Sequence, residues 1–242
     1  NIALAGCADG AGCLASANVV TGVVTVTDSV LNTAFDSGVH VEQTDGTISN
    51  LNVSNNSITS TTSTATSKGV GIKIIPKGTA AVAADVTQAT IANNVITNFP
   101  SNAGIQVIGG NSNAAGPAGF VGDPTPGTDT INITGNTISG QSAANRMGTS
   151  GIELSVNGGN SASRSQGNFN LSGNNQISNV AGTGILIGHN GYADGNYVIN
   201  GNTINANNIN ASPGIGGGNG IGLSTAATPL KGATVTTNNI SD

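Results

Sequence analysis

The feature that most constrains the fold is the segment Ile131–Ile138, which alternates apolar and polar residues, bends at Gly135-Asn136 and ends on isoleucine. A second segment, Gly151-Ile-Glu-Leu154, follows thirteen residues later and is a glycine leading into a short alternating stretch. Both have the period of two that is typical of β-strands with one buried face. The rest of the chain repeats these two segments, so they predict the architecture but no reaction.

The first segment defines a repeat, apolar-x-apolar-x-x-Asn-x-apolar, with variable spacing between copies. The seven copies are Val24–Leu31, Leu51–Ile58, Ala89–Ile96, Ile131–Ile138, Phe169–Ile177, Tyr197–Ile204 and Ala233–Ile240. The first copy has Ser29 in place of asparagine, and the fifth contains one extra residue. The six copies after the first carry the repeated asparagine, and these residues are Asn56, Asn94, Asn136, Asn174, Asn202 and Asn238.

The second segment, Gly-apolar-x-apolar, alternates strictly with the first. Its six copies are Gly38–Val41, Gly71–Ile74, Gly104–Val107, Gly151–Leu154, Gly184–Ile187 and Gly220–Leu223. Such short strands cannot bury a face alone, but they become stable when equivalent strands stack about 4.8 Å apart. The sequence therefore predicts an all-β solenoid of about seven coils with variable loops over residues 24–242, preceded by a capping or lead-in segment, residues 1–23.

The repeated asparagine has two interpretations. Asparagine tolerates left-handed backbone and bonds within its own turn, so turn propensity alone would explain it. Stacked asparagines can also form an amide ladder in which each side chain bonds to its neighbours. Because six of the seven copies keep the residue, we expect the ladder.

These repeats resemble the right-handed parallel β-helix of the pectate-lyase-like superfamily, over roughly Val24 to Ile240. The resemblance implies a single-stranded right-handed parallel β-helix, with Gly-Ile-x-Ile in one sheet, Ile-x-Ile in the second and the residues after the asparagine in the third. The superfamily includes polysaccharide lyases and hydrolases, phage tailspikes, and passenger domains of secreted adhesins and autotransporters. With 7% charged residues, this chain is most similar to the secreted passenger type.

Composition excludes several classes of function. The net charge is −5 and only six Lys and Arg are present, which disfavours nucleic-acid binding. No apolar run reaches the roughly 18 residues of a membrane helix. No signal peptide is visible and the chain does not start with Met, so we expect a processed product at an extracellular or cell-surface location. We expect no cofactor and no metal site, because the acidic residues are scattered.

Both cysteines, Cys7 and Cys13, lie in the lead-in segment, separated by five small residues. We predict a disulfide, which suits an oxidising compartment. The alternative is a pair of free thiols. A zinc site is disfavoured because two thiols fall short of a ligand set.

The middle residues of the Gly-apolar-x-apolar strands form an outward column. In order, they are His40, Lys73, Gln106, Glu153, Leu186 and Gly222. If the protein is an enzyme, the first catalytic candidates are His40, Glu42, Lys73 and Glu153, because they could supply an acid and a base. However, stacking would separate His40 from Glu153 by about 14 Å. A solvated polar face is therefore the favoured interpretation.

The outward columns of the second strand are small and uncharged. They read Thr25, Asn52, Thr90, Asn132, Asn170, Val198, Thr234 and Thr27, Ser54, Ala92, Thr134, Ser172, Asn200, Thr236. Their interpretations are a solubilising wall, a face for lateral association or carbohydrate contact, and an ice-binding face. The long loop at 109–130, with Phe120, is either a solvated insertion or a binding loop.

The last repeat ends at Ile240 without a polar cap, so we expect more protein, or a second copy, to stack on it. The expected function is a non-catalytic secreted or cell-surface structural or adhesive β-helix: a stalk, passenger domain or filament subunit. Its partners would be further copies of itself and a glycan or cell-surface ligand. The alternative is a polysaccharide-binding or polysaccharide-degrading β-helix.

Overall fold

The structure is a computed structural model of the 242-residue chain. It describes residues 2–5, 20–33, 37–61, 69–78, 82–100, 102–110, 119–122, 130–140, 147–158, 164–205, 220–226 and 232–241. These residues form β-strands and no helix, and every pairing between named strands is parallel. The all-β parallel architecture expected from the period-two repeats is confirmed.

Three parallel sheets make up the body. Sheet 1 contains, in spatial order, β1 (Ile2–Ala5), β4 (Val39–Gln43), β7 (Ile72–Pro76), β11 (Ile105–Gly110), β15 (Ser150–Asn157), β18 (Thr183–Asn190) and β21 (Ile221–Ala226). Sheet 2 contains β12 (Gly119–Val121), β8 (Ala84–Val86), β5 (Gly46–Ser54), β9 (Ala89–Ala92), β13 (Ile131–Thr134), β16 (Ser165–Ser172), β19 (Ala193–Asn200) and β22 (Gly232–Thr236), and β2 (Gly22–Thr27) pairs with β5. Sheet 3 contains β3 (Val30–Thr33), β6 (Ser57–Ser60), β10 (Val95–Thr97), β14 (Thr137–Ser139), β17 (Gln176–Ser178), β20 (Thr203–Asn205) and β23 (Asn239–Ser241).

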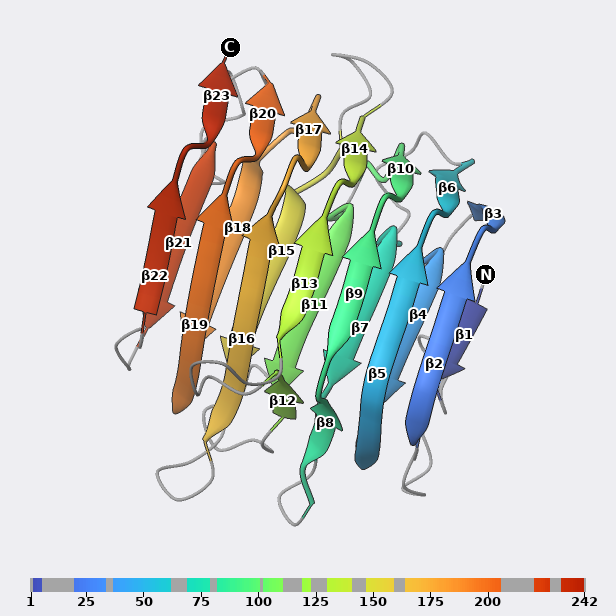
Figure 1. Cartoon of the computed structure of the whole chain (residues 1–242), viewed down its shortest axis with the longest axis vertical. Helices are drawn as coiled ribbons and strands as arrows, with labels where there is room; N and C mark the ends of the chain where they lie inside the picture. Colours follow the sequence, from blue (N-terminus) through green and yellow to red (C-terminus); the bar gives the residue numbers. More distant parts are fainter. Residues whose placement is uncertain are drawn as a thin grey trace.

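The chain visits sheets 1, 2 and 3 in turn and then returns to sheet 1 beside its previous strand. In Figure 1 the strands of sheets 1 and 2 lie face to face and run in opposite directions, and sheet 3 forms a narrow third side. The described residues nearest the two ends of the chain lie at opposite ends of the stack (Figure 1). This arrangement is that of a parallel β-solenoid.

Sheet 1 has one strand more than the Gly-apolar-x-apolar pattern indicates. β1 lies in the segment that we expected to precede the repeat, and Ile2 pairs in register with Val39 of β4. The pattern does not reveal this strand because its sequence, Ile-Ala-Leu-Ala, has no leading glycine. Cys7 and Cys13, for which we predicted a disulfide, lie outside the described residues.

The interior explains the recurrent glycine. A central column of isoleucines in sheet 3, namely Ile58, Ile96, Ile138, Ile177 and Ile204, is 0–1% exposed and pairs in register. Five of the glycines that open sheet 1 strands each face one of these isoleucines, and the sixth, Gly220, faces Ile240 of β23. A Cβ on Gly104, for example, would lie 2.9 Å from the Gly151 carbonyl oxygen and nearer still to Ile138 Cγ2. The glycine is therefore required by close packing across the interior rather than by a special backbone angle.

Two stacked aromatic rings fill the interior near one end of the solenoid. Phe169 and Tyr197 lie opposite each other on β16 and β19, with ring centroids 5.1 Å apart and planes within 12°. Gly167 and Gly195, two residues earlier on the same strands, leave room for the rings, since a Cβ at either position would meet the ring at 2.6 Å. The absence of a side chain at each glycine thus provides the volume that each ring occupies in the same layer of the core.

The bend between sheets 2 and 3 carries a continuous amide ladder. Each ladder asparagine donates from Nδ2 to Oδ1 of the next asparagine, at 2.8–3.0 Å, along the series Asn56, Asn94, Asn136, Asn175, Asn202 and Asn238. The same Nδ2 groups also donate to backbone carbonyls of the preceding coil, as Asn136 does to Ile91 at 2.8 Å. Every member from Asn56 to Asn202 is buried to 1% exposure or less. The predicted ladder is confirmed.

The prediction that Asn174 belongs to the ladder is wrong. The fifth copy contributes Asn175, whereas Asn174, which we predicted, is exposed and has a φ of 65°. The ladder position is the residue directly before each sheet 3 strand, and Gln176 opens that strand here. The extra residue is absorbed in the bend, where Gly173 also has a positive φ of 86°. The register of sheet 3, not the distance from sheet 2, therefore sets which asparagine is buried.

Candidate functional site

The outward column of sheet 1 is the first candidate surface. His40, Lys73, Gln106, Glu153, Leu186 and Gly222 are consecutive register partners across six strands. The column predicted from the sequence is therefore present. Apart from Lys73, its polar members belong to two separate groups, one around His40 on β4 and one around Glu153 on β15.

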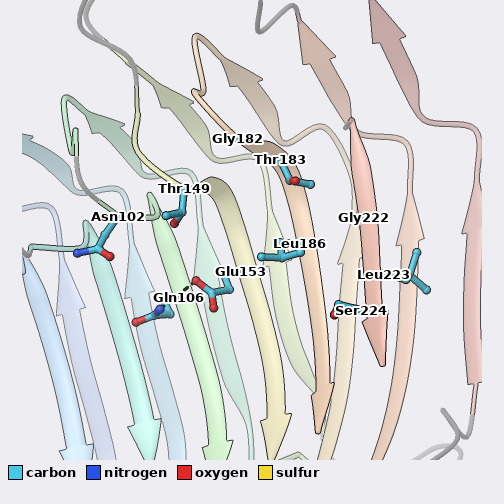
Figure 2. A pocket seen from close by; sticks show the side chains of 10 residues that line it. All are labelled: Asn102, Gln106, Thr149, Glu153, Gly182, Thr183, Leu186, Gly222, Leu223 and Ser224. Atoms are coloured by element: carbon cyan, nitrogen blue, oxygen red, sulfur yellow. Dashed lines mark hydrogen bonds between the residues drawn. The ribbon is translucent and has the colours of Figure 1, made fainter. Parts of the chain in front are cut away.

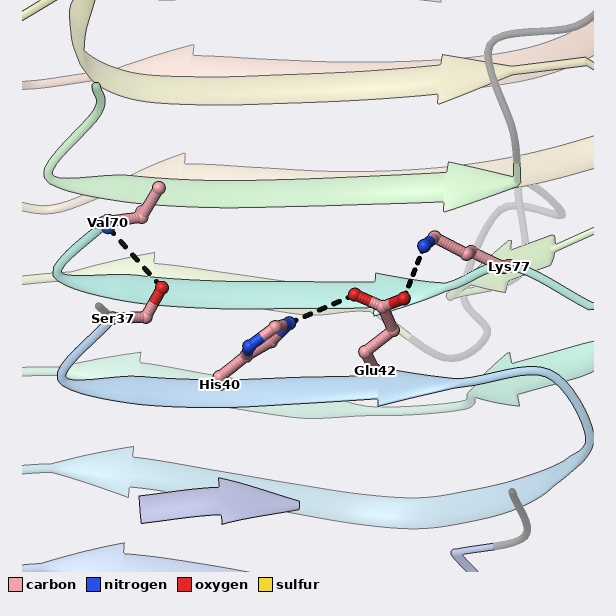
Figure 3. Close-up of polar contacts among 5 residues, drawn as sticks. All are labelled: Ser37, His40, Glu42, Val70 and Lys77. Carbon is pink, nitrogen blue, oxygen red and sulfur yellow. Dashed lines mark hydrogen bonds and ion pairs between the residues drawn. The ribbon is translucent and has the colours of Figure 1, made fainter. Parts of the chain in front are cut away.

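The first group links His40, Glu42 and Lys77 (Figure 3). His40 Nε2 donates to Glu42 Oε2 at 3.1 Å, and the Lys77 ammonium forms an ion pair with the other carboxylate oxygen. Lys77 follows β7, so the pair joins two neighbouring coils. The His40 side chain is 4% exposed and the Glu42 side chain is 19% exposed. In this group the buried His40 imidazole is hydrogen-bonded to the Glu42 carboxylate, and the same carboxylate forms an ion pair with the more exposed Lys77.

Electrostatics keep the Glu42 carboxylate ionised. The hydrogen bond from His40 lowers the pKa of Glu42 to about 2, burial opposes this effect, and Lys77 adds to the lowering. A carboxylate with so low a pKa accepts hydrogen bonds but does not donate a proton near neutral pH. Glu42 can therefore orient His40 and anchor Lys77, but it is not suited to be a general acid.

The second group lines a groove on the outer face of sheet 1 (Figure 2). Gln106 Nε2 donates to a Glu153 carboxylate oxygen at 3.0 Å across the β11–β15 pair. The groove has a volume of about 530 Å³. Its lining residues are Asn102, Gln106, Thr149, Glu153, Gly182, Thr183, Leu186, Gly222, Leu223 and Ser224. Amide, hydroxyl and carboxylate groups beside two leucines form a surface that can hydrogen-bond a polar chain.

The two groups do not combine into one acid–base pair. β7 and β11 lie between β4, which carries Glu42, and β15, which carries Glu153. Three strand spacings amount to about 14 Å, which exceeds the roughly 5–9.5 Å between the carboxylates of glycosidases. Of the catalytic candidates, the structure brings His40 and Glu42 together and places Lys73 opposite His40, and it leaves Glu153 apart.

The second of the chain's two histidines, His189, lies near the end of β18. His189 is 0% exposed and its Nε2 lies 3.1 Å from the Ala193 carbonyl oxygen. Burial lowers the pKa of His189. A buried neutral imidazole with a backbone partner has a structural role at the end of β18.

The outer face of sheet 2 is the second candidate surface. Its first predicted column is continuous in register from Thr25 to Thr234. In the β13, β16 and β19 part of this face, amides bond from coil to coil: Asn170 Nδ2 donates to Asn132 Oδ1 at 3.0 Å, and Asn196 Nδ2 donates to Asn168 Oδ1 at 3.0 Å. These polar groups form lateral hydrogen bonds between coils.

Sequence reasoning missed Lys77 and the groove-lining residues of the sheet 1 turns. Lys77 N donates to the Gln43 carbonyl, which places Lys77 one step beyond β7 and beside Glu42. Extending the β4–β7 register by one residue beyond Pro76 would have identified Lys77 as a neighbour of the end of β4. Asn102, Thr149 and Gly182 lie in turns of variable length, for which the repeat gives no alignment.

Two general properties bear on function. Within the described ranges, no group of three or more His, Cys, Asp and Glu side chains is placed to hold a metal ion. The described part of the chain also contains no helix long and apolar enough to cross a membrane.

The fold and the ladder define the class of protein as a parallel β-solenoid with an internal asparagine ladder. Comparison with known protein families, with curated proteins and with solved structures gives no match to the chain. The function must therefore be argued from the surfaces described above.

Proposed function

We propose that this chain is a secreted or cell-surface structural or adhesive β-helix, acting without catalysis as a stalk, passenger domain or filament subunit. In this proposal the solenoid is a right-handed single-stranded β-helix of about seven coils, of the pectate-lyase-like type. The observation that carries the proposal is the outer face of sheet 2, where uncharged side chains hydrogen-bond from coil to coil.

Such a face suits a protein that works by length and stiffness. Lateral bonds such as Asn170 to Asn132 add to the backbone hydrogen bonds that hold successive coils together. The buried ladder does the same at the bend, where an unpaired amide would be costly. The hydrogen bonds on the outer face of sheet 2 and those of the ladder both oppose the separation of neighbouring coils. A stalk or filament under tension needs this resistance.

Self-association is proposed on the face formed by β21, β22 and β23. Leu223, Val235 and Ile240 are 47%, 44% and 54% exposed. Their register partners one coil earlier, Ile187, Ile199 and Ile204, are 0–1% exposed. An apolar edge of this kind favours stacking of another β-coil upon it.

Electron microscopy of the purified protein tests this proposal. Rigid rods, or fibres with an axial repeat of roughly 30–35 Å for seven stacked coils, would support it. Attachment to cells or extracellular matrix would support the adhesive form. Compact particles that attach to no surface would contradict both forms.

The sheet 1 groove favours a second candidate, polysaccharide binding or degradation. Glu153 and Gln106 line it, and its lining residues come from four neighbouring strands, β11, β15, β18 and β21, and from adjacent turns. The test is depolymerisation of a panel of acidic and neutral glycans by wild-type protein and by Glu153→Gln. Cleavage that is lost in the variant would replace the non-catalytic proposal with this one, and inactivity on the panel would count against it.

A further inference from the structure

Two of the described aromatic residues, Phe120 on β12 and Tyr192 directly before β19, keep part of their side chains exposed. The chain has four Phe and two Tyr. Phe99, Phe169 and Tyr197 are 0–1% exposed, and Phe35 lies outside the described residues. The remaining two, Phe120 and Tyr192, are half-buried and 43% exposed, respectively. Both belong to the part of sheet 2 around β16, because β12 and β19 each pair with that strand.

Strand register places Phe120 on the outer face of sheet 2, in one row with Gln166 and Asp194. Phe120 of β12 pairs with Gln166 of β16, and Gln166 pairs with Asp194 of β19. The residues that alternate with them, such as Val121 and Ala193, are 0% exposed, so the three paired side chains point outward. Adjacent strands are about 5 Å apart, which places Phe120 and Asp194 about 10 Å apart.

Tyr192 and an ion pair complete this surface. Ser165 N donates to the Tyr192 carbonyl at 3.2 Å, which places the Tyr192 backbone directly before β19 and next to the start of β16, close to Arg164. Arg164 Nη2 lies 3.0 Å from Asp194 Oδ1 and donates to the Ala193 carbonyl at 3.1 Å. The Arg164 and Asp194 side chains are 36% and 12% exposed. We call Phe120, Arg164, Gln166, Tyr192 and Asp194 the aromatic–ion patch.

The patch differs chemically from the rest of sheet 2. Elsewhere the outward amides bond to their equivalents on the next coil, as Asn170 does to Asn132. The patch instead offers guanidinium and amide donors, carboxylate and amide acceptors, and two rings. The Arg164 Nε atom is buried and, among the described residues, has no hydrogen-bond partner.

We propose that the aromatic–ion patch binds a neutral saccharide of a surface glycan. One sugar ring would stack its C–H face on Tyr192 or Phe120, because the electron-rich face of an aromatic ring attracts polarised C–H groups. The sugar hydroxyls would bond to Asp194, Arg164 and Gln166. A neutral ligand is favoured because Asp85 lies on the other side of Phe120 and the chain has a net charge of −5. This inference rests on the proposed adhesive function and gives it a ligand class.

The test uses the whole protein and a panel of soluble neutral glycans, namely β-1,4-glucan oligomers, mannan and dextran, with polygalacturonate as an acidic comparison. Titration calorimetry should show binding to a neutral glycan and at least about tenfold weaker binding for Tyr192→Ala and for Asp194→Asn. Tyr192→Phe, which keeps the ring, should retain most of the affinity. Thr134→Ala, on the same face away from the patch, is the matched control, and circular dichroism checks the folding of every variant.

Three outcomes would overturn the proposal. Binding that is unchanged in both patch variants but lost in Glu153→Gln would assign the glycan to the sheet 1 groove. Preference for polygalacturonate would contradict a neutral ligand. Attachment of wild-type protein to cells without binding to any neutral glycan would overturn the patch but keep the adhesive function, whereas absence of any attachment would contradict both.

Discussion

Asparagine is used in two rows of this molecule, and the rows differ in burial. In the bend between sheets 2 and 3, amides such as Asn136 are 0% exposed and bond both to other amides and to backbone carbonyls. On the outer face of sheet 2, Asn170 makes the same amide-to-amide bond at 3.0 Å but is only half-buried. Because water can replace a bond lost on the surface but not one lost in the interior, the same contact stabilises the two places to different extents.

The largest expected effect is in the buried row. Asn136→Ala removes the acceptor of Asn94 N and Nδ2 and the donor to the Ile91 carbonyl. Several buried polar groups then lack partners, and we expect a loss of roughly 4 kcal/mol in the free energy of unfolding. Urea denaturation measures it. A loss below about 1 kcal/mol would show that the ladder hydrogen bonds contribute little to stability beyond the turn propensity of asparagine.

Acidification tests the His40–Glu42–Lys77 cluster. Its Glu42 side chain is 19% exposed, which is intermediate between the buried and the exposed asparagine rows. The pKa of Glu42 falls from 4.5 when unfolded to about 2 when folded. A lowered folded pKa gives stability that is complete above the unfolded pKa and is lost as the pH falls from about 4.5 toward 2. The contribution is at most about 3 kcal/mol.

Thermal denaturation between pH 6 and pH 2 measures this contribution. Glu42→Gln should flatten the dependence of stability on pH in the acidic range, because the titrating group is gone. Glu153→Gln is the matched control and should keep the slope, since it leaves the His40–Glu42–Lys77 cluster intact. An equal slope for wild type and Glu42→Gln would contradict the proposed role of the cluster.

Glycine packing gives an interior effect that does not depend on hydrogen bonds. Gly104→Ala would force a methyl group against Ile138 and the Gly151 carbonyl, at a cost of about 1–3 kcal/mol. Gly222→Ala is the matched control, because this outward position has its nearest atom, Thr183 Cγ2, at 3.3 Å. Comparable unfolding midpoints for the two variants would show that the interior can relax around an added methyl group.

The smallest effect is expected in the exposed row. Asn170→Ala removes the bond to Asn132 Oδ1 on the outer face, where water can substitute. We expect a change of about 0.5 kcal/mol in the free energy of unfolding, well below that of Asn136→Ala. A loss as large as that of Asn136→Ala would mean that burial is not what separates the two rows.

Much of the fold could be predicted because its determinants are local. Period-two segments such as Ile131–Ile138 and the bend after Thr134 specify strands and a turn without reference to the rest of the chain. Stacking of equivalent positions then gave the outward column from His40 to Gly222, and the register confirms it. The choice of Asn174 failed because an insertion in the bend shifted the count by one residue.

The candidate surfaces were less predictable, because they depend on neighbours separated by a whole coil. Lys77 lies on the next coil, 35 residues after Glu42, and its side chain contacts the Glu42 carboxylate. Arg164, directly before β16, pairs with Asp194 on the neighbouring strand β19. Phe120 joins that surface through a short strand inside what the sequence indicates only as a long loop. Loops of variable length break the alignment between coils, so the repeat alone cannot place these side chains together.

The sequence by itself determined the strand type, the positions of the bends and the residues that face the interior, because side-chain alternation and turn chemistry act over a few residues. The tertiary structure alone decided which asparagine entered the ladder, why the repeated glycines are required, and which charged and aromatic side chains meet on the surface. The physical reason is that these contacts form only when one coil is laid in register on the next, and that register depends on how each loop returns the chain to sheet 1.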